Sequence, residues 1–581
     1  MSEPTKSDCG ERSIEPSEPE ASSRVSRRDV LFGAAGIGAT AAVATSVALP
    51  KTARADDYSS DAGDVAYDGF RRADVAFVKR LRSAKVQRHE TLNLEDQRDN
   101  DDESRYEDEL FISSFHKCLP QNEFGEVRPR AYRKLRRACR RGDPKRFDRI
   151  PLSSVADRTL ANPQGAFRFE PWGLDSHATR MPPAPAFRSP TIAAEMGEVY
   201  WQAFTRDVPF NRYGSDGLVD AAVQDVNRFS KTVGPKMGGK VTPATLFRGE
   251  TRGDLIGPYI SQFLWLDVPW GPSRIVQRYE VPVAGEEYMI DQAEWLRIQR
   301  GANPSSPLNF EPTFRYIYNN RALGEYVHRD VLFQAYFNAA LILLSFGNEA
   351  IDPANPYTKT GANQGGFTSL GPPFILDLVT RAGNLGLSGA WFHKWRIHRR
   401  LRPEVFGGRA HFNVTGQRSY EICDEFFASR ALELAFETNG TGFLPMAFPE
   451  GSPTHPAYPA GHATVAGSCC TVLKALFNED FVLPRPVVSN DDGTVLNAYN
   501  GSLRAGDEIN KLAANVSIGR DAAGVHYRSD GIDGLVVGEQ QALTLLREAS
   551  TLLNEDFDGF TLSLFDGSRV RITDGQIIDE H

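Results

Sequence analysis

Residues 331–345 read VLFQAYFNAALILLS and carry no charged side chain. A segment of this length that is apolar nearly all round predicts a helix enclosed by others, as inside a helical bundle. Apolar residues recur with a helical period at 192–204, 217–229, 421–437, 465–477 and 536–553. Strand patterns are confined to 275–283 and to a hairpin around Asp566-Gly567 within 560–572. We therefore expect an all-α fold, one large helical bundle or two fused four-helix bundles, with a few small β-hairpins.

The composition is that of a globular protein of ordinary charge. Of the 581 residues, 41% are hydrophobic and 24% are charged, and the net charge is −9. The hydrophobic fraction excludes disorder for the bulk of the chain. An acidic balance also speaks against general nucleic-acid binding, which requires a basic surplus. After residue 55 no segment approaches 18 uncharged apolar residues, so we expect no stable membrane insertion of the mature chain.

The first 55 residues predict an export signal. Ser26-Arg27-Arg28-Asp29 precedes an uncharged run rich in Ala and Gly over 30–49, and Ala53-Arg54-Ala55 is a small-x-small cleavage site. This order is typical of a Tat signal, and the run holds too few Leu and Ile residues to favour a transmembrane anchor. We therefore expect export to the periplasm or the extracellular space. Residues 56–110, with an acidic run at 99–108, predict a polar linker and an N-terminal surface segment, and 111–581 the helical domain.

Three segments within residues 391–530 carry the candidate chemistry. The first reads KWRIHRRLRP from Lys394 to Pro403. Pro403 disfavours helical geometry at Arg402, which places Arg402 at a helix end. Lys394 and Arg402 lie about 12 Å apart along a continuous helix, so they reach one anion only if the helix ends there or the Arg402 side chain folds back. The other arginines are interpreted as a solvated basic face: Arg396, Arg399 and Arg400.

The second segment reads PEGSPTHPAYPAGH over 449–462 and leads directly into the helix expected to end at Phe477. Prolines and glycines shape a rigid loop there, and Gly461 lets a ligand approach the backbone. The free N–H groups and the positive dipole end of the following helix form an anion site.

The third segment reads GRDAAGVHYRSD over 519–530. Its two flanking glycines are expected to let the backbone bend and present Arg520 and His526. Asp530, four residues after His526, could accept the second imidazole N–H and fix the tautomer.

Taken together, the three segments supply one lysine, two arginines, three histidines and a helix N-terminus. Planar guanidinium groups each bind two oxygens, so this set suits a tetrahedral oxyanion. The histidines lack compact zinc spacing, and no carboxylate cluster there supports magnesium or calcium. The predicted ligand is phosphate or an ion of the same shape.

These segments resemble the signature of the vanadium-dependent haloperoxidases and of their relatives, the type-2 phosphatidic acid phosphatases. That signature is Lys–x–Arg-Pro, then Pro-Ser-Gly-His, then Arg–x5–His. Two details favour the bromoperoxidase branch. Lys394 and Arg402 are eight residues apart, where the phosphatases usually have seven, and His455 stands seven residues before His462, as in the algal bromoperoxidases.

The likeness extends upstream of the three segments. Residues 115–126 (FHKCLPQNEFGE) and 363–367 (NQGGF) look like segments of the red-algal and cyanobacterial type, so the resemblance covers most of 100–553. It implies a homo-oligomer. Some red-algal relatives also carry a structural calcium in a loop near 351–373, where Asp352 alone does not establish a site.

The resemblance implies one vanadate per chain and a role for each site residue. Four groups would hold the vanadate oxygens: Lys394, Arg402, Arg520 and the backbone N–H of Gly461. His526 would bind vanadium axially, and His462 would serve as acid and base when peroxide binds. His455 would tune the site and help to place halide or protons, while Lys394 would also donate to the bound peroxide.

Two positions modify this expectation. The family commonly has Ser where this chain has Ala460, so one hydroxyl donor is missing. A hydrogen bond to a charged oxygen is worth roughly 1.5–3 kcal/mol, which predicts weaker vanadate binding unless a water substitutes. Trp391, three residues before Lys394, varies among relatives, and its large ring would desolvate halide and affect the choice between chloride and bromide.

The implied activity is oxidation of bromide by hydrogen peroxide to hypohalous acid, which then halogenates small organic acceptors, with chloride and iodide left open as substrates. One alternative is an exported acid phosphatase that uses the same pocket, with His526 as nucleophile, Asp530 as its orienting group and His462 as acid. A second is a non-catalytic oxyanion-binding or structural bundle.

Overall fold

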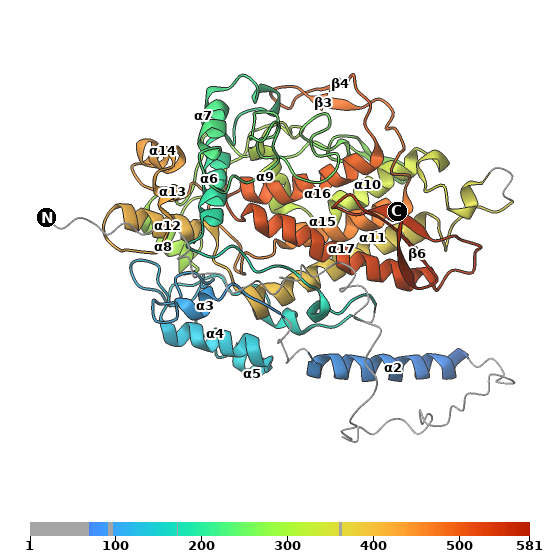
Figure 1. The fold of residues 1–581 in the computed structure, drawn as a ribbon, viewed down its shortest axis with the longest axis horizontal. Coiled ribbons are helices and arrows are strands. Elements are labelled where there is room, and N and C mark those ends of the chain that lie inside the picture. Colours follow the sequence, from blue (N-terminus) through green and yellow to red (C-terminus); the bar gives the residue numbers. More distant parts are fainter. Residues whose placement is uncertain (1–68, 91–96, 171, 360–362, 581) are drawn as a thin grey trace, which may run out of the picture.

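The computed structural model describes residues 69–90, 97–170, 172–359 and 363–580. It is mostly helical and carries only small groups of strands, so the predicted all-α class is confirmed (Figure 1). The expected Tat signal lies outside the described residues. Among the described helices, none combines the length and the apolar character needed to cross a membrane.

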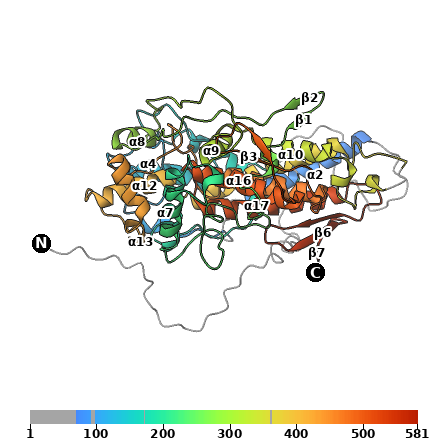
Figure 2. The same cartoon turned by 90° about the horizontal axis from the view of Figure 1, so that it is seen from above.

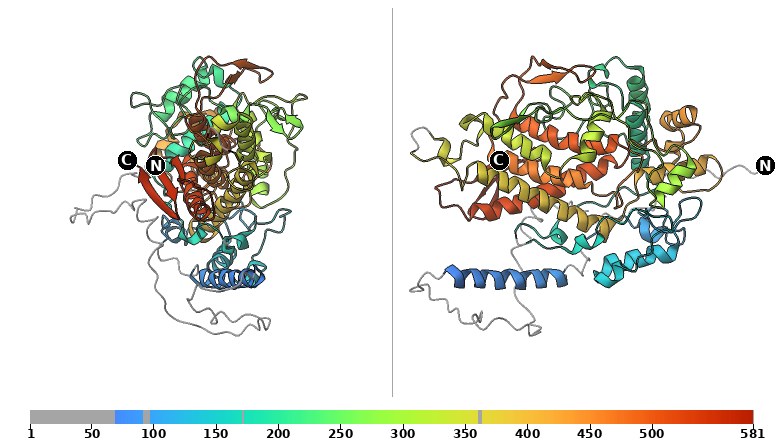
Figure 3. Two further views of the ribbon diagram at one scale, coloured as in Figure 1. Left: turned by 90° about the vertical axis from the view of Figure 1, so that its right-hand side faces the viewer. Right: turned by 180° about the vertical axis from the view of Figure 1, so that it is seen from behind.

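Helix α15 (Gly461–Leu476) forms the centre of the main bundle. It packs against α11 (Pro372–Phe392), α16 (Ala505–Ala522) and α17 (Arg528–Ser550), which run beside it in Figures 1 and 3. Glycines permit this close packing. A Cβ at Gly467 would lie 2.1 Å from the carbonyl oxygen of Leu535, and one at Gly538 would lie 2.1 Å from that of Thr464. The backbones of α15 and α17 therefore touch directly where these glycines lie.

Further helices extend this bundle and form a second group at the other end of the molecule (Figure 2). Two helices pack on the main bundle: α9 (Asn320–Arg329) and α10 (Gln334–Ser345). The second group, labelled in Figure 1, comprises α6 (Pro190–Phe204), α7 (Gly217–Val226), α8 (Gln292–Gln299), α12 (Pro403–Val414), α13 (Asp424–Phe427) and α14 (Arg430–Asn439). The N-terminal part contributes α2 (Gly69–Glu90), α3 (Asp102–Arg105), α4 (Pro129–Arg141) and α5 (Pro144–Phe147).

The helices predicted from periodicity are present with shifted ends. The segment 331–345 forms α10, which begins three residues later than expected, and the segment 421–437 is divided into α13 and α14. The division occurs at Ser429, whose side chain accepts a hydrogen bond from the N–H of Leu432 and caps α14. The long helices α11 and α16 and the shorter helices α9 and α12 were not predicted from periodicity.

All strand pairs are small and antiparallel. β1 (Val268–Trp270) pairs with β2 (Ser273–Ile275), and β3 (Val487–Ser489) pairs with β4 (Leu496–Ala498). The predicted C-terminal hairpin is present as β5 (Phe560–Ser563) and β6 (Arg569–Thr573), and β7 (Gln576–Glu580) adds a third strand. The strand expected over 275–283 is wrong, because β2 ends at Ile275 and only isolated bridges follow it at Tyr279 and Pro282.

The segment 56–110 contains more structure than the polar linker that its composition suggests. Helix α2 lies within it, apart from the bundle, along the bottom of Figure 1 and to the right of α5. The acidic run was interpreted as surface, but Asp102 and Glu103 are buried. Glu103 lies against Arg399, and this ion pair explains how a carboxylate from a charged run enters the interior.

Candidate active site

The backbone between Lys394 and Arg402 departs from a straight helix. Helix α11 ends at Phe392 and continues as a π-helical turn over His393–His398, after which Arg399 adopts a left-handed conformation with φ of 39°. Arg402 is then the N-cap residue of α12. The helix therefore ends between the two cations, which allows both to face one site.

The intervening arginines are not a solvated face, and that interpretation is wrong. Arg396, Arg399 and Arg400 are each at most 3% exposed. Arg399 Nε lies 2.6 Å from Glu103, and Arg400 contacts Glu195 at 3.0 Å. Carboxylates from distant segments neutralise Arg399 and Arg400. The sequence of the basic segment alone could not predict these partners. Arg396 instead lies against aromatic rings, with its guanidinium carbon 4.4 Å from the ring centre of Phe167.

Arg402 connects the three segments that carry the candidate chemistry. Its Nη1 lies 2.9 Å from Nε2 of His526, and its Nη2 lies 2.9 Å from Nδ1 of His455. Its Nε donates to the carbonyl oxygen of His455 at 2.9 Å. Lys394 Nζ donates to the neighbouring carbonyl oxygens of Pro456 and Ala457, both at 2.7 Å. These hydrogen bonds connect the first segment to the second and the third.

His526 lies in the turn between α16 and α17. Its Nδ1 is 2.8 Å from Oδ2 of Asp530 in the first turn of α17, so the hydrogen bond expected between these residues is present. Since Asp530 accepts the Nδ1 proton, the lone pair of neutral His526 is on Nε2, which faces Arg402. Burial, together with Arg402 and Lys394, lowers the pKa of His526 well below its usual value. The imidazole is therefore neutral at ordinary pH.

The N-terminus of α15 faces the same group of residues. Ala460 is the N-cap residue and Gly461 the first helical residue. A Cβ at Gly461 would lie 3.5 Å from the ring of Trp391 and 4.0 Å from Cε of Lys394. The Trp391 ring in turn contacts His455, with 4.8 Å between ring centres. The first N–H groups of α15, which a helix cannot satisfy itself, thus point toward a cationic site.

Arg520 comes from the last turn of α16. Its Nη1 donates to the carbonyl oxygen of Val327 at 2.7 Å, while its buried Nε has no hydrogen-bond partner among the described residues. The expectation that Gly519 and Gly524 both bend the chain next to Arg520 and His526 is half right. Gly519 lies inside α16, whereas Gly524 has a φ of 81° and makes the turn that leads to His526.

His462 is oriented by a residue that sequence reasoning missed. Its Nε2 lies 2.8 Å from Oδ1 of Asp330, which directly follows α9. The His462 side chain is 29% exposed and that of Asp330 is 6% exposed, so solvent reaches the imidazole while the carboxylate is buried. The two residues are 132 positions apart, and no local pattern links them.

The cationic side chains lie close enough to perturb one another. Burial lowers the pKa of Lys394 well below its usual value, and Arg402 and Arg520 lower it further. The pKa of Arg402 falls to about 9 and that of Arg520 to about 10, in both cases mainly through burial. Asp530 is the main counter-charge to Lys394 and Arg402, and it is already engaged by Arg400 and His526, whereas Asp330 is the main counter-charge to Arg520.

This donor set fits a tetrahedral oxyanion bound to an imidazole nitrogen. Three buried cations, an unpartnered guanidinium nitrogen and a helix N-terminus supply donors, and His526 Nε2 supplies a ligand atom. In the part of the chain that the structure describes, no group of three or more His, Cys, Asp or Glu residues could hold a metal cation. In the loop where calcium was considered, Asp352 is half-buried and accepts a hydrogen bond from the N–H of Ala354, and its partial burial raises its pKa to about 6.

Comparison with known proteins supports the fold. The family model described as the VCPO second helical-bundle domain matches residues 427–555. A vanadium-dependent bromoperoxidase of Ascophyllum nodosum is 34% identical over 493 residues, which cover 79% of this chain and 86% of that protein. A vanadium-dependent bromoperoxidase of Corallina pilulifera is 32% identical over 549 residues, which cover 80% of this chain and 92% of that protein.

The solved structures include a close match. The homohexameric structure of the second vanadate-dependent bromoperoxidase (AnII) from Ascophyllum nodosum superposes with a TM-score of 0.81 at 29% identity. The match covers 92% of this chain and 96% of that one. Similarity in sequence and similarity in fold thus each extend along most of the chain. The chain therefore belongs to the vanadium-dependent bromoperoxidase family, a family of haloperoxidase enzymes whose cofactor is vanadate.

Proposed function

We propose that this chain uses vanadate to oxidise bromide with hydrogen peroxide and one proton, giving hypobromous acid and water, and that the acid halogenates small organic acceptors. The observation that carries this proposal is the bridge that Arg402 makes between His455 and His526 at 2.9 Å each. It brings the lone pair of His526 and the cationic donors to the N-terminus of α15. The relatives reported above are named as bromoperoxidases, which favours this reaction over the phosphatase alternative.

Different residues are assigned to the oxygens and to the vanadium of vanadate. Lys394, Arg402, Arg520 and the Gly461 N–H would hold the oxygens of vanadate, and Nε2 of His526 would bind its vanadium. When bound, vanadate supplies a Lewis-acidic centre that makes hydrogen peroxide more electrophilic. Asp530 keeps the proton on Nδ1 of His526 and so keeps the ligand atom free.

Proton transfer is assigned to His462. Asp330 engages its Nε2, so the neutral imidazole carries its proton there and exposes Nδ1 as the atom that takes and returns a proton. Its partial exposure lets it exchange protons with solvent. Lys394, held by two carbonyl oxygens, is placed to donate a hydrogen bond to bound peroxide.

Trp391 is assigned to the halide preference. Its ring lies against His455 and next to Gly461, so it limits the water that can reach that side of the site. Bromide loses its hydration shell at lower cost than chloride does, and an apolar wall therefore favours bromide. Rates with chloride, bromide and iodide are measured for Trp391→Arg, with Trp391→Phe as the apolar control. A changed halide order in Trp391→Arg alone supports the assignment, and an unchanged order in both variants ends it.

We also propose Tat-dependent export and assembly of several identical chains. Export rests on the twin arginines Arg27-Arg28, and Arg27→Lys together with Arg28→Lys is expected to retain the protein in the cytoplasm. Assembly rests on the homohexameric structure of the relative, and light scattering of the purified protein tests it.

The proposed reaction is tested with three halides and one phosphate ester on the same preparation. Halogenation of a dye is followed with vanadate and peroxide, and release of p-nitrophenol from p-nitrophenyl phosphate is followed without vanadate. Bromination well above phosphate release supports the haloperoxidase. Rapid phosphate release without halogenation would make His526 a phosphoryl nucleophile instead.

A further inference from the structure

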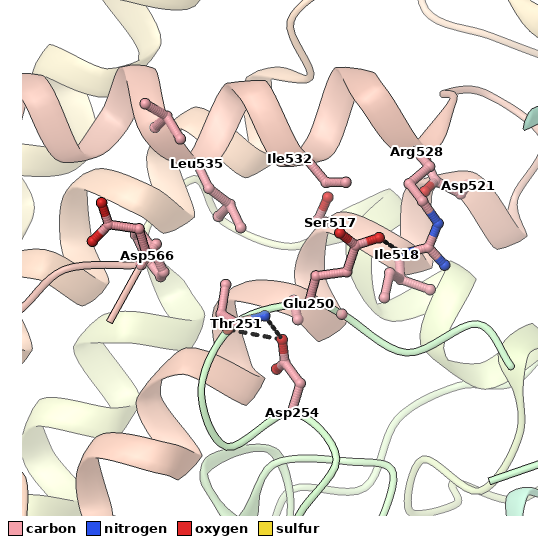
Figure 4. Close-up of a pocket in the computed structure, with 14 residues that line it drawn as sticks. Glu250, Thr251, Asp254, Ser517, Ile518, Asp521, Arg528, Ile532, Leu535 and Asp566 are labelled. Carbon is pink, nitrogen blue, oxygen red and sulfur yellow. Dashed lines mark hydrogen bonds and ion pairs between the residues drawn. The ribbon is translucent and has the colours of Figure 1, made fainter. Parts of the chain in front are cut away.

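A cavity of about 240 Å³ lies between α16, α17 and the loop 249–254 (Figure 4). The turn between β5 and β6 closes one side with Phe565 and Asp566. None of the residues assigned to the vanadate site is among those that line this cavity. It is therefore a separate feature of the bundle.

Most of the cavity wall is apolar. Two helices and the turn supply the lining side chains: Ala514, Ile518, Ile532, Leu535, Val536 and Phe565. All but Ile532 and Val536 are buried, and Ile532, 38% exposed, marks the rim. A wall of this kind favours the hydrocarbon part of a small organic molecule over a hydrated inorganic ion.

The cavity also contains two buried carboxyl groups with unsatisfied oxygens. Asp254 is 1% exposed and Asp521 is 3% exposed. Within the described ranges of the chain, Oδ1 of each has no hydrogen-bond partner. The other oxygen of Asp254 accepts from the N–H of Thr251 at 2.7 Å and from its hydroxyl at 2.8 Å, so this carboxyl group is held in place (Figure 4). Burial raises the pKa of Asp254 to about 7.

The remaining charges around the cavity are mainly negative. Glu250, whose carboxylate lies 3.8 Å from Arg528, and Asp566 are exposed at its rim (Figure 4). The basic residue in the lining, Arg528, is ion-paired with Glu198 and also donates to the carbonyl oxygen of Arg248 at 2.9 Å. Its charge is thus already neutralised, and a ligand in this cavity meets an acidic environment.

We propose that this cavity binds a small organic ammonium ion, whose N–H groups donate to Oδ1 of Asp254 and whose hydrocarbon part lies against α16 and α17. An ammonium group has donors and no acceptor, so it satisfies the unpartnered carboxyl oxygen. Binding of the cation also favours the ionised form of Asp254, which makes the hydrogen bond charge-assisted.

Equilibrium dialysis of the full-length, vanadate-loaded enzyme tests the proposal with phenethylammonium as the probe. Phenethyl alcohol has the same hydrocarbon part without the charge, and phenylacetate reverses the charge. We expect phenethylammonium to bind at least about tenfold more tightly than either, as a charge-assisted hydrogen bond requires. Asp254→Asn should lower its affinity about tenfold, and Asp574→Asn, in the exposed β6–β7 turn, should leave it unchanged.

A second variant tests the proposal even if Asp254→Asn fails to fold. Ile532→Trp narrows the rim of the cavity and leaves Asp254 unchanged. This variant should lower the affinity for all three probes and retain the bromination rate. The absence of phenethylammonium binding to the wild-type enzyme would overturn the proposal. So would equal affinity for the alcohol, or an affinity that neither Asp254→Asn nor Ile532→Trp changes.

Discussion

Nη1 of Arg402 lies 2.9 Å from Nε2 of His526. Asp530 engages the other ring nitrogen, Nδ1, so Nε2 keeps its lone pair. A guanidinium group next to a neutral imidazole nitrogen marks the place where an oxyanion can be held by the first residue and bound through the second. The arrangement also makes His526 depend on Asp530, because protonation of Nε2 instead of Nδ1 would direct a hydrogen at Arg402.

Asp530→Asn is expected to lower vanadate affinity about 10- to 100-fold, the usual effect of removing a carboxylate that orients a metal-binding histidine. Vanadate binding is measured by equilibrium dialysis. Asp533→Asn serves as control, because Asp533 lies on the same helix but bonds the hydroxyl of Tyr458 instead of His526. Equal losses of vanadate affinity in the two variants would contradict this role of Asp530 and would show a general effect of substitutions on α17.

Asp330→Asn is expected to reduce kcat about 10-fold or more with little change in vanadate affinity. The physical reason is that Asp330 hydrogen-bonds His462 and sets its tautomer, whereas it acts on Arg520 only through its charge. Steady-state kinetics at saturating vanadate measure the effect. Loss of vanadate binding in parallel with kcat would contradict the assigned role.

Ala460→Ser is expected to raise vanadate affinity about 10-fold, since a hydrogen bond to a charged oxygen is worth roughly 1.5–3 kcal/mol. Ala460 is the N-cap residue of α15, so a serine hydroxyl there could instead accept from the N–H groups of the helix. Vanadate titration and thermal unfolding are measured together. A higher melting temperature with unchanged affinity would show that the hydroxyl caps the helix and does not reach the anion.

Glu103→Gln is expected to lower the free energy of unfolding by about 3–5 kcal/mol, because it leaves the Arg399 charge buried without its partner. The folded fraction of Glu103→Gln should bind vanadate with the affinity of the wild-type protein. Chemical denaturation measures the change, with Glu107→Gln as control for a carboxylate at the surface that pairs with Arg133 and Arg136. A similar small change in both variants would mean that the buried Glu103–Arg399 pair does not stabilise the protein more than the surface pairs of Glu107 do.

His393 makes stability depend on pH. Burial lowers the pKa of its imidazole to about 3, while the unfolded chain takes up a proton near 6.5. Unfolding therefore binds a proton between these values, so the stabilising contribution is complete above pH 6.5 and is lost as the pH falls. His393→Gln should destabilise the protein by about 2 kcal/mol less at pH 5 than at pH 7. An equal destabilisation at both values would contradict the shift.

Local pattern predicted much of this molecule. The apolar run at 331–345 identified α10, the loop before His462 identified the start of α15, and the four-residue spacing identified the contact between His526 and Asp530. These features depend on residues that are close in the chain. Sequence alone also supplied the residues of the candidate site through their resemblance to a family.

Pairings between distant segments could not be predicted. Arg399 was interpreted as solvated because its partner Glu103 is 296 residues away, and Asp330 was missed because it reaches His462 across 132 residues. The long helix α11 was missed for a related reason. It is buried on several sides, and glycines that allow close backbone contact interrupt the periodic pattern that would have marked it.

The most direct test of the account is vanadate-dependent bromination by the chain from Asp56 onward, purified, stripped of bound ions and assayed with each component omitted in turn. We expect turnover only with vanadate, peroxide and bromide together, saturating at one vanadate per chain and abolished in His526→Ala. Bromination that persists without added vanadate, or that is unchanged in His526→Ala, would contradict the assignment of His526, Arg402 and their neighbours to the vanadate site.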